Sequence, residues 1–418
     1  ARHTGGTFVL RIEDTDAARN TQEAVDVILS GLRWMGIEWD EGPETGDSSA
    51  AGKGDYGPYF QSRRAANYQK RVNELRDKGL AYEQEGAIKF KMEQKPIVIP
   101  DLVVGNVTRE LTDRERLDPD FVLIRSDGQP VFHFVNVVDD LEMKITHVIR
   151  GEDHLANTAK HLALFRAFGV EPPKYAHIPL ILNIDGTKMS KRDTGASLNS
   201  YVEEGYAPEA VVNYLCLLGW SPKENREIVP VEEVIQLFDL PQILRHNARF
   251  DINKLHWMNG EYIRQMTQDR FNGFAADALK RHGIDVSAYP ADYQTAAFAT
   301  CKEKVKQFTE VKIFADFYFQ EAVEIEEASR KDLTEENARI LKTLRPLLEQ
   351  HEPFTADTLG APLKKAAAEL GVKIGLVVHP TRLACTGRTV GPSLYHLIEV
   401  LGKARVLRRI DDFIRAAS

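Results

Sequence analysis

A segment near the middle of the sequence places the strongest constraint on the fold. Residues 178–182 form an apolar run interrupted only by Pro179, and Asn183 with Asp185-Gly186 then supplies turn residues that can take positive φ angles. The next five residues are Lys188-Met189-Ser190-Lys191-Arg192. Open α/β sheets bind nucleotides at the carboxyl ends of their strands, where a loop that leaves a strand lies. The segment therefore predicts a clamp for a triphosphate on an α/β sheet, with a solvated basic loop as the alternative.

The composition is that of a globular protein. The chain has 418 residues, of which 43% are hydrophobic and 28% are charged, and its length favours roughly three domains. No apolar run approaches the roughly 20 residues needed to cross a membrane, so we expect no membrane partner. Cys216, Cys301 and Cys385 are scattered singly, which indicates neither a disulfide framework nor a metal site. We expect a soluble, cytoplasmic monomer.

The overall charge is acidic. The net charge is −8 and the pI is 5.9, which argues against a generally basic nucleic-acid binder but leaves room for a local basic face. Two clusters of cations are candidates for such a face, with ordinary solvated helix sides as the alternative. They are Lys302, Lys304 and Lys306, and Lys403, Arg405, Arg408, Arg409 and Arg415.

Strand and helix patterns alternate over roughly the first 80 residues. Residues 7–12 are predicted to form a short strand, and Asn20 to cap the helix that follows, with Glu23 at its third position. A second helix is predicted to begin at Ser62. Each helix has one apolar stripe at helical spacing, formed by Val25, Ile28, Leu29, Leu32 and Met35 in the first and by Tyr68, Val72 and Leu75 in the second.

Short β-like runs broken by Pro, Gly and Asp follow, and we interpret them as an insertion. They cover 88–92, 97–99 and 121–124. The sheet is predicted to resume with strands at 145–149 and 177–182 around a helix at 155–168, and helices at 208–218 and 231–238 come after the lysine loop. The sequence thus predicts an α/β fold with a split parallel sheet, followed by a largely helical half.

Three further motifs agree with the lysine loop. They are Leu10-Arg11-Ile12-Glu13-Asp14-Thr15-Asp16 with Arg19 close behind, His147-Val148-Ile149-Arg150-Gly151-Glu152-Asp153-His154, and Phe250-Asp251 with Lys254-Leu255 and Trp257-Met258-Asn259-Gly260. In this order they resemble motifs of the glutamyl and glutaminyl class I aminoacyl-tRNA synthetases, whose KMSKS motif the lysine loop resembles. The resemblance runs from Ala1 to about Arg409, and the chain is identified as a member of the bacterial-type glutamyl-tRNA synthetases.

One motif of this family is absent from the sequence. Class I synthetases carry a HIGH-type motif on the helix after their first strand, and here residues 1–6 already resemble the end of that helix. We therefore expect the first strand and most of the first helix to be missing, by truncation or because only ordered residues are given. The missing segment would hold histidines that contact ATP and part of the amino-acid pocket.

The resemblance implies the domain organisation. Residues 1–80 and 131–185 would be the two parts of a split Rossmann-type catalytic domain, and 81–130 an inserted connective domain that receives the acceptor end of tRNA. Residues 186–270 would be a stem-contact domain, and 271–418 an all-α anticodon-binding region of two subdomains.

The resemblance also implies ATP-dependent ligation of L-glutamate to tRNA-Glu through a glutamyl-adenylate. Charge builds on phosphate oxygens as pyrophosphate leaves, so the site needs fixed cations and Mg²⁺. Lys188 and Lys191 are the candidate catalytic cations at ATP. Ser190 would orient their loop, and Met189 would lie beside ATP.

Glutamate recognition requires an anion for the ammonium group and a planar cation for a carboxylate. Glu13 and Arg150 both follow predicted strands, and the resemblance gives them these two roles, with a mutual or neighbouring salt bridge as the alternative. Phe132, Asn136 and His154 occupy other pocket positions of the family, and Phe132 stands where relatives often have Tyr. The alternatives are core packing on a strand for the first two and a packed or surface histidine for the third.

The resemblance assigns Asp16, Arg19, Lys304 and Arg388 to tRNA, and Asp16 and Arg19 could alternatively brace the local turn. Lys304 stands where many relatives have Arg, and an ammonium cannot match two acceptors on a base edge. One alternative is therefore an enzyme that also charges tRNA-Gln, and another is an inert tRNA-binding fragment, because the HIGH-type segment is absent. A glutaminyl enzyme would end in β-barrels, and a related glutamyl transferase that modifies tRNA would lack the helical half.

Overall fold

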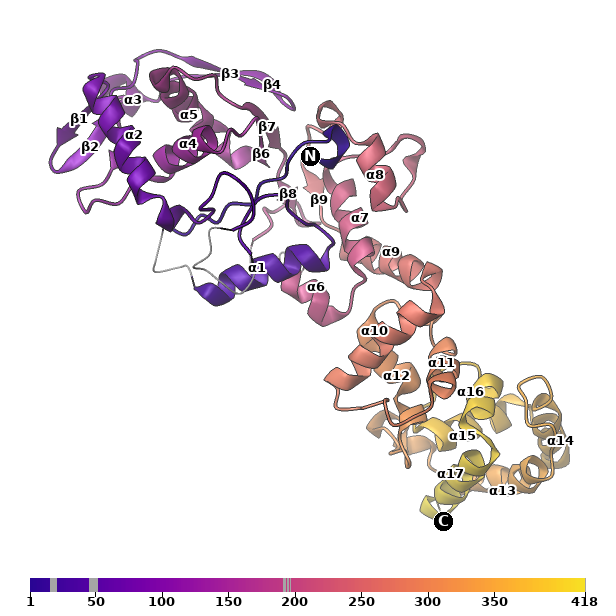
Figure 1. Ribbon diagram of the computed structural model, residues 1–418. Coiled ribbons are helices and arrows are strands. Elements are labelled where there is room, and N and C mark those ends of the chain that lie inside the picture. Colours follow the sequence, from indigo (N-terminus) through magenta and orange to yellow (C-terminus); the bar gives the residue numbers. More distant parts are fainter. Residues whose placement is uncertain (16–20, 45–51, 191–192, 194, 196, 418) are drawn as a thin grey trace. The chain divides into compact units, whose positions relative to one another are not determined.

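The computed structural model of the chain describes residues 1–15, 21–44, 52–190, 193, 195 and 197–417 (Figure 1). These residues form two compact units, one of Ala1–Ser200 with Pro208–Ile252 and one of Tyr201–Ala207 with Asn253–Ser418. All strands that the structure describes lie in the first unit, and the second unit is helical. The predicted α/β half and helical carboxyl half are therefore confirmed, while the finer division into five segments stays a prediction.

Small sheets make up the β-structure of the first unit. An antiparallel sheet joins β1 (Ala81–Gln84), β2 (Ala87–Phe90) and β5 (Phe121–Ile124). A mixed sheet has the order β4-β3-β7-β6 and consists of β3 (Ile97–Asp101), β4 (Gly105–Arg109), β6 (His147–Gly151) and β7 (Lys174–Ile178). In it, β3 and β6 both run parallel to β7, so a strand of the predicted insertion belongs to the parallel sheet. Finally, β8 (Ile181–Leu182) runs parallel to β9 (Ala248–Arg249).

Helices occur in both units. The first unit contains α1 (Gln22–Trp34), α2 (Ala65–Asp77), α3 (Asp113–Leu117), α4 (Phe132–Glu142), α5 (Leu155–Phe168), α7 (Pro208–Gly219) and α8 (Val231–Leu237), while α6 (Leu198–Glu204) and α9 (Ile252–Gln265) cross into the second. The second unit continues with α10 (Gln268–Arg281), α11 (Ala291–Ala299), α12 (Val311–Ala315), α13 (Glu335–Glu349), α14 (Gly360–Leu370), α15 (Gly375–Thr386), α16 (Leu394–Leu401) and α17 (Lys403–Ala416). The predicted helix at 155–168 is α5 to the residue, and α7 and α8 each differ from prediction by one residue.

Helices α2, α4 and α5 bury their apolar faces against the antiparallel sheet. Tyr68, Val72 and Leu75 recur at helical spacing on α2, and all three are buried, as predicted. A 3-10 turn precedes α2, which therefore begins at Ala65 and not at Ser62. Helix α5 also packs on β3 and β7 in a second cluster, so it contacts both of the larger sheets.

The strand predicted at 7–12 is reduced to isolated parallel bridges, Val9 with Glu41 and Ile12 with Phe60. The segment is extended, and its backbone bonds to residues 40–41 and 59–61. A 3-10 turn at Gln61–Arg63 follows Phe60 directly, so the pairing of Ile12 with this segment cannot continue as a ladder. The prediction of a regular strand was wrong here, although the segment does lie alongside two others in parallel.

The cap and the stripe of α1 also differ from prediction. Thr21 is the capping residue, and its hydroxyl accepts the N–H of Ala24 at 3.2 Å. Asn20, the predicted cap, lies outside the described residues. The buried stripe is narrower than predicted, because Ile28 is 47% exposed whereas Val25 and Leu29 are buried.

Two predicted strands of the second half of the catalytic segment are corrected. Pro179 divides the strand expected at 177–182, because proline has no N–H to donate to a ladder, so β7 ends at Ile178 and β8 begins at Ile181. The strand expected at 145–149 begins two residues later, at His147. Residues 132–142 form the helix α4, whereas core packing on a strand was the alternative considered for Phe132 and Asn136. The segment is helical because packing against α2 and α5 covers it on several sides.

Candidate functional site

Arg150 lies near the carboxyl end of β6, and its neighbours fix its guanidinium group. Its Nε donates to Nε2 of His177 at 3.2 Å, and its Nη2 donates to the hydroxyl of Thr158 at 2.8 Å and to the carbonyl of His154 at 3.3 Å. The guanidinium carbon lies 5.4 Å from the centroid of the Tyr175 ring. Burial lowers the pKa of Arg150, yet a guanidinium stays protonated at neutral pH. The site therefore contains a cation of fixed orientation.

An aromatic wall lies next to Arg150. Phe132, on α4, is 38% exposed, and its ring centroid lies 5.7 Å from that of His154. Behind it, Nδ1 of His133 lies 3.3 Å from Nε2 of His161. Burial lowers the pKa of His133 to about 4 and that of His161 well below its ordinary value. Both of these rings are neutral at pH 7, so His133 and His161 add no charge to the site.

Glu13 supplies the anion of the site. Its carboxylate lies 3.8 Å from Arg11 and is 44% exposed. Burial raises the pKa of Glu13, and Arg11 opposes this shift. The carboxylate interacts electrostatically with both Arg150 and His154. The structure thus brings three predicted pocket residues together, and it also contains the neighbouring salt bridge that was the alternative for Glu13.

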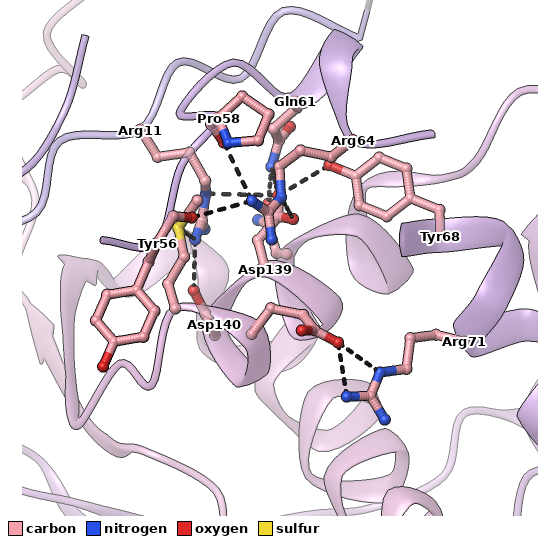
Figure 2. Close-up of polar contacts among 12 residues, drawn as sticks. Arg11, Tyr56, Pro58, Gln61, Arg64, Tyr68, Arg71, Asp139 and Asp140 are labelled. Carbon is pink, nitrogen blue, oxygen red and sulfur yellow. Dashed lines mark hydrogen bonds and ion pairs between the residues drawn. The ribbon is translucent and has the colours of Figure 1, made fainter. Parts of the chain in front are cut away.

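A buried polar network lies behind the extended segment that carries Arg11 (Figure 2). Nη1 of Arg11 donates to Oδ1 of Asp140 at 2.9 Å. Asp139 accepts from Nε of Arg64 at 2.6 Å and from the hydroxyl of Tyr68 at 2.9 Å. Burial acts against the charge of Arg11, but Asp140 and Asp139 outweigh burial and raise the pKa of Arg11. This network joins the first segment of the chain to α2 and α4.

Asn136 is the least accessible of the residues predicted to bind glutamate, with 6% exposure. It lies on α4, four residues after Phe132. Its Oδ1 accepts from Nε2 of Gln61 at 3.0 Å, and the same nitrogen donates to Oδ2 of Asp139 at 3.0 Å. Asn136 is thus tied to the buried network, and its contact with substrate stays a prediction.

The lysine loop leaves β8 through a tight hairpin. The N–H of Asn183 donates to the carbonyl of Thr187 at 2.8 Å, and the N–H of Met189 donates to the carbonyl of Ile181 at 3.2 Å. Gly186 has a φ of 90°, as predicted for this turn. The predicted arrangement of a strand that leads into the lysine loop is therefore confirmed.

Three of the four predicted ATP-site residues of this loop, Lys188, Met189 and Ser190, lie within the described residues. Nζ of Lys188 lies 3.7 Å from Oδ2 of Asp153, and its side chain is 60% exposed. The N–H of Ser190 donates to Oδ2 of Asp193 at 2.6 Å, which holds the loop closed at its base. Lys191 lies outside the described residues. Asp153 belongs to the same motif as Arg150, so Lys188 lies near the end of β6.

Lys304 lies on an exposed turn of the second unit and not on a helix. Its backbone N–H donates to the carbonyl of the buried Cys301 at 2.8 Å, which anchors the turn. Asp16 and Arg19 lie outside the described residues. The assignment of these three side chains to tRNA stays a prediction.

Arg388 and Arg409 make contacts inside the second unit. Arg388 donates to both carboxylate oxygens of Asp316, at 2.8 and 2.7 Å, and its assignment to tRNA stays a prediction. Arg409 is 2% exposed and donates to the carbonyls of Phe317 and Gln320 at 2.7 and 2.6 Å. The prediction that Arg409 belongs to a basic face was wrong, because this residue lies on the buried stripe of α17.

Other classes of site were also considered. Across the described ranges, no group of three or more His, Cys, Asp and Glu side chains is arranged to hold a metal ion. No helix in the same ranges is long and apolar enough to cross a bilayer. The three cysteines are present as free thiols.

Sequence reasoning missed the residues that support the site from behind. Gln61 connects Asn136 to the buried network, and Asp101 pairs with His177 behind Arg150, with 2.7 Å between Oδ2 and Nδ1. Both members of this pair are polar residues in strands that are otherwise largely apolar, and a buried polar group requires a partner. That signal was available, but it does not say which two residues pair.

Comparisons with known proteins cover both units. The family described as tRNA synthetases class I (E and Q), catalytic domain, matches residues 1–87 and 83–257, and the family described as anticodon binding domain matches residues 262–414. The glutamate–tRNA ligase of Methylacidiphilum infernorum is 49% identical over 98% of this chain and 91% of its own length. That of Akkermansia muciniphila is 45% identical over 99% of this chain and 92% of its own length.

Two solved structures of glutamate–tRNA ligases are also similar to this chain. The crystal structure of a glutamate tRNA ligase from Elizabethkingia meningosepticum, in complex with its amino acid, has a TM-score of 0.80 and 30% identity, and the match covers 100% of this chain and 94% of that one. The glutamate-tRNA synthetase of Elizabethkingia anophelis has a TM-score of 0.77 and 29% identity, with 99% and 94% covered. Similarity thus extends along nearly the whole length of the chain.

Proposed function

The chain belongs to the glutamate–tRNA ligase family of class I tRNA synthetases, and we propose on this premise that it joins L-glutamate to tRNA-Glu with consumption of ATP. In the first step, the α-carboxylate of glutamate attacks the α-phosphorus of ATP, so that pyrophosphate leaves and glutamyl-adenylate forms. In the second step, a hydroxyl of the terminal ribose of tRNA attacks the activated carbonyl, and AMP leaves.

The observation that carries the proposal is the presence of Glu13 and Arg150 in one site. Glutamate has an ammonium group and two carboxylates, so it requires an anion and a cation of fixed orientation. Arg150 is held by hydrogen bonds, and Glu13 lies close enough to interact with its charge. Phe132 and His154 form an adjoining aromatic wall, which limits the space for the substrate.

The lysine loop supplies the chemistry at ATP. Lys188 and Lys191 would stabilise the negative charge that develops on the phosphate oxygens, and Ser190 would orient their loop. We propose that Mg²⁺ accompanies ATP and offsets part of the charge of the phosphates. Because the described residues offer no cluster of three or more metal-binding side chains, phosphate oxygens and water would provide most ligands of this ion.

The helical second unit would bind tRNA, since its similarity is to an anticodon binding domain. The relatives named above are described as glutamate–tRNA ligases, which favours an active ligase over an inert tRNA-binding fragment and over an enzyme of relaxed specificity. We propose a cytoplasmic location, where tRNA is charged, and the expected monomeric state stays a prediction.

The test is a charging assay with the protein expressed from its own gene. Radiolabelled glutamate, ATP and purified tRNA-Glu should yield acid-precipitable glutamyl-tRNA, whereas labelled glutamine should not. The same tRNA oxidised with periodate is the matched control, because it lacks the terminal ribose diol and cannot accept glutamate. Equal charging of tRNA-Gln would support relaxed specificity, and tRNA binding without charging would support the inert fragment.

A further inference from the structure

A buried carboxylate at the end of β3 organises the site from behind. Oδ1 of Asp101 accepts the N–H groups of Val103 and Val104 at 2.8 and 2.9 Å. Its Oδ2 accepts the backbone N–H of His177 at 3.0 Å and lies 2.7 Å from Nδ1 of the same residue. Both oxygens are thus fixed by groups of β7 and of the turn after β3. Asp101 is 8% exposed and His177 is fully buried, so water does not compete for these bonds.

This pairing determines which nitrogen of His177 carries the proton. A carboxylate next to Nδ1 favours the tautomer with the hydrogen on Nδ1, which leaves a lone pair on Nε2. Nε2 lies 3.2 Å from Nε of Arg150, and Nε of an arginine can only donate. The buried Thr158 completes the arrangement, because its oxygen accepts from Nη2 of Arg150 at 2.8 Å. Nε and Nη2 of Arg150 thereby each have an acceptor, and the Thr158 hydroxyl also lies 3.2 Å from Nε2 of His177.

These contacts use only some of the N–H donors of Arg150. Nε and Nη2 are used by His177, Thr158 and the carbonyl of His154. Among the described residues, none accepts a hydrogen bond from Nη1. The ring of Tyr175 beneath the guanidinium restricts rotation of the group. The two N–H groups of Nη1 therefore keep a fixed direction and remain available to an anion.

We propose that Asp101 and His177 are positioning residues for glutamate selection: they hold Arg150 so that Nη1 meets a carboxylate of glutamate. This inference rests on the proposed function and adds to it two residues that do not touch the substrate. The carboxylate of Asp101 fixes the tautomer of His177, His177 accepts from Nε, and the guanidinium is thereby oriented before glutamate arrives. Such preorganisation strengthens binding because the side chain is ordered in advance.

The arrangement predicts a pH dependence of glutamate binding. A protonated His177 would present an N–H to the N–H of Arg150, and the cation would lose its acceptor. Burial lowers the pKa of His177 below the ordinary value of 6.5, against the opposing effect of Asp101. The ionisable groups around this ring are Asp101 after β3, Arg150 on β6, His154 before α5, His161 on α5 and Tyr175 on β7 itself. The KM for glutamate should therefore rise as pH falls below 6.5 through the lowered pKa of His177.

The experiment compares His177→Phe with His177→Gln in steady-state charging. The phenylalanine cannot accept from Arg150, so the KM for glutamate should rise about tenfold, as expected for loss of a bond to a charged group, while kcat and the KM for ATP change by less than about threefold. The amide oxygen of glutamine can occupy the place of Nε2 and should restore most of the affinity. Asp101→Asn should give an intermediate KM, and the exposed His147→Phe is the control that should behave as wild type.

Nitrogen-15 NMR of histidine-labelled protein provides a readout independent of activity. The His177 ring should show the Nδ1–H tautomer in the wild type, and Asp101→Asn should reduce its population. An unchanged KM for glutamate in His177→Phe would overturn the inference, as would a uniform loss of kcat and of affinity for all substrates in both His177 variants. A wild-type protein that does not charge tRNA would instead contradict the proposed function, and the inference would fail with it.

Discussion

Arg64 and Asp139 form an ion pair from which solvent is excluded. Nε of Arg64 lies 2.6 Å from Oδ1 of Asp139, and their side chains are 2% and 0% exposed (Figure 2). Nη1 of Arg64 is also used, since it donates to the carbonyls of Tyr56 and Pro58 at 3.2 and 3.1 Å. The pair therefore connects the start of α2 with α4 behind the candidate site. Removal of Arg64 would leave the carboxylate of Asp139 in the interior with only the longer ion pair to Arg11, at 3.8 Å, among the described residues.

Arg64→Met should destabilise the first unit strongly, by about 3 kcal/mol, because it removes the cation that donates directly to the buried Asp139 and leaves that carboxylate with the longer ion pair to Arg11 at 3.8 Å. The control is Arg76→Met on the same helix, which breaks the exposed pair with Glu83 and should change stability by less than about 1 kcal/mol. Urea titrations followed by tryptophan fluorescence measure both. Similar midpoints for the two variants would contradict a structural role of the buried pair.

Glu115 provides a test of pH dependence. Its carboxylate accepts from Nη2 of Arg109 at 2.7 Å, and this bond, with a further bond from Thr112, lowers the pKa of Glu115 from 4.5 to about 2. A lowered pKa stabilises the fold in full above pH 4.5, and the effect is lost as pH falls through about 2. Glu115→Gln should therefore reduce the free energy of unfolding at pH 7, by about 1 kcal/mol after solvent screening.

The difference between wild type and Glu115→Gln should shrink as pH falls from 4.5 toward 2. Urea titrations at several pH values measure this difference directly. The exposed neighbour Glu110, changed to Gln, should alter stability by less than about 0.5 kcal/mol at each pH. A constant difference for Glu115→Gln across the range would show that its pairing with Arg109 does not contribute.

Arg150→Lys tests the proposed glutamate contact. A lysine ammonium cannot donate to His177, Thr158 and a substrate carboxylate at the same time, because it lacks the planar fork. The KM for glutamate should rise by roughly 10- to 100-fold, with a smaller effect on the KM for ATP. The exposed Arg166→Lys is a matched control on α5. A normal KM in Arg150→Lys would remove Arg150 from the pocket.

Lys188→Ala tests the lysine loop. We expect kcat to fall by on the order of 10² to 10³, as for the loss of one preorganised electrostatic contact in the transition state, and Lys191→Ala should behave alike. Affinity for tRNA should change little, since the second unit, which is similar to an anticodon binding domain, stays intact. The exposed Lys223→Ala serves as control. If the rate of adenylate formation is normal in both loop variants, the assignment of the ATP site is wrong.

The elements that were predicted well are those whose local sequence is sufficient to determine their structure. Helix α5 was predicted to the residue because its apolar residues recur at helical spacing and Gly169 ends it with a φ of 73°. The loop after β8 was predicted from Gly186 and its neighbours, which define a turn by local chemistry alone. Helix α4 was not recognised, because its run of Phe and Val residues is typical of a buried strand and only packing against α2 and α5 decides otherwise.

The residues of the candidate site also differ in whether the sequence could predict them. Glu13 and Arg150 could be named because short motifs contain them and because each follows a predicted strand. The partners that orient Arg150 could not, since His177 and Asp101 are 76 residues apart in sequence. Pairing over such a separation is a property of the strand order in the sheet, which places the end of β3 beside β7.

The last prediction concerns Lys304, which is exposed on a turn of the second unit. If its ammonium meets a phosphate or a base of tRNA, Lys304→Ala should raise the KM for tRNA several-fold and leave the KM for glutamate unchanged, because Lys304 belongs to the second unit and the proposed glutamate pocket to the first. The slope of log affinity against log salt should fall by about 0.7 to 0.9, the value for one lost phosphate contact. Lys280→Ala, also exposed in this unit, is the control. An unchanged slope together with a normal KM for tRNA would exclude Lys304 from the interface, whereas a changed KM with an unchanged slope would indicate contact with a base.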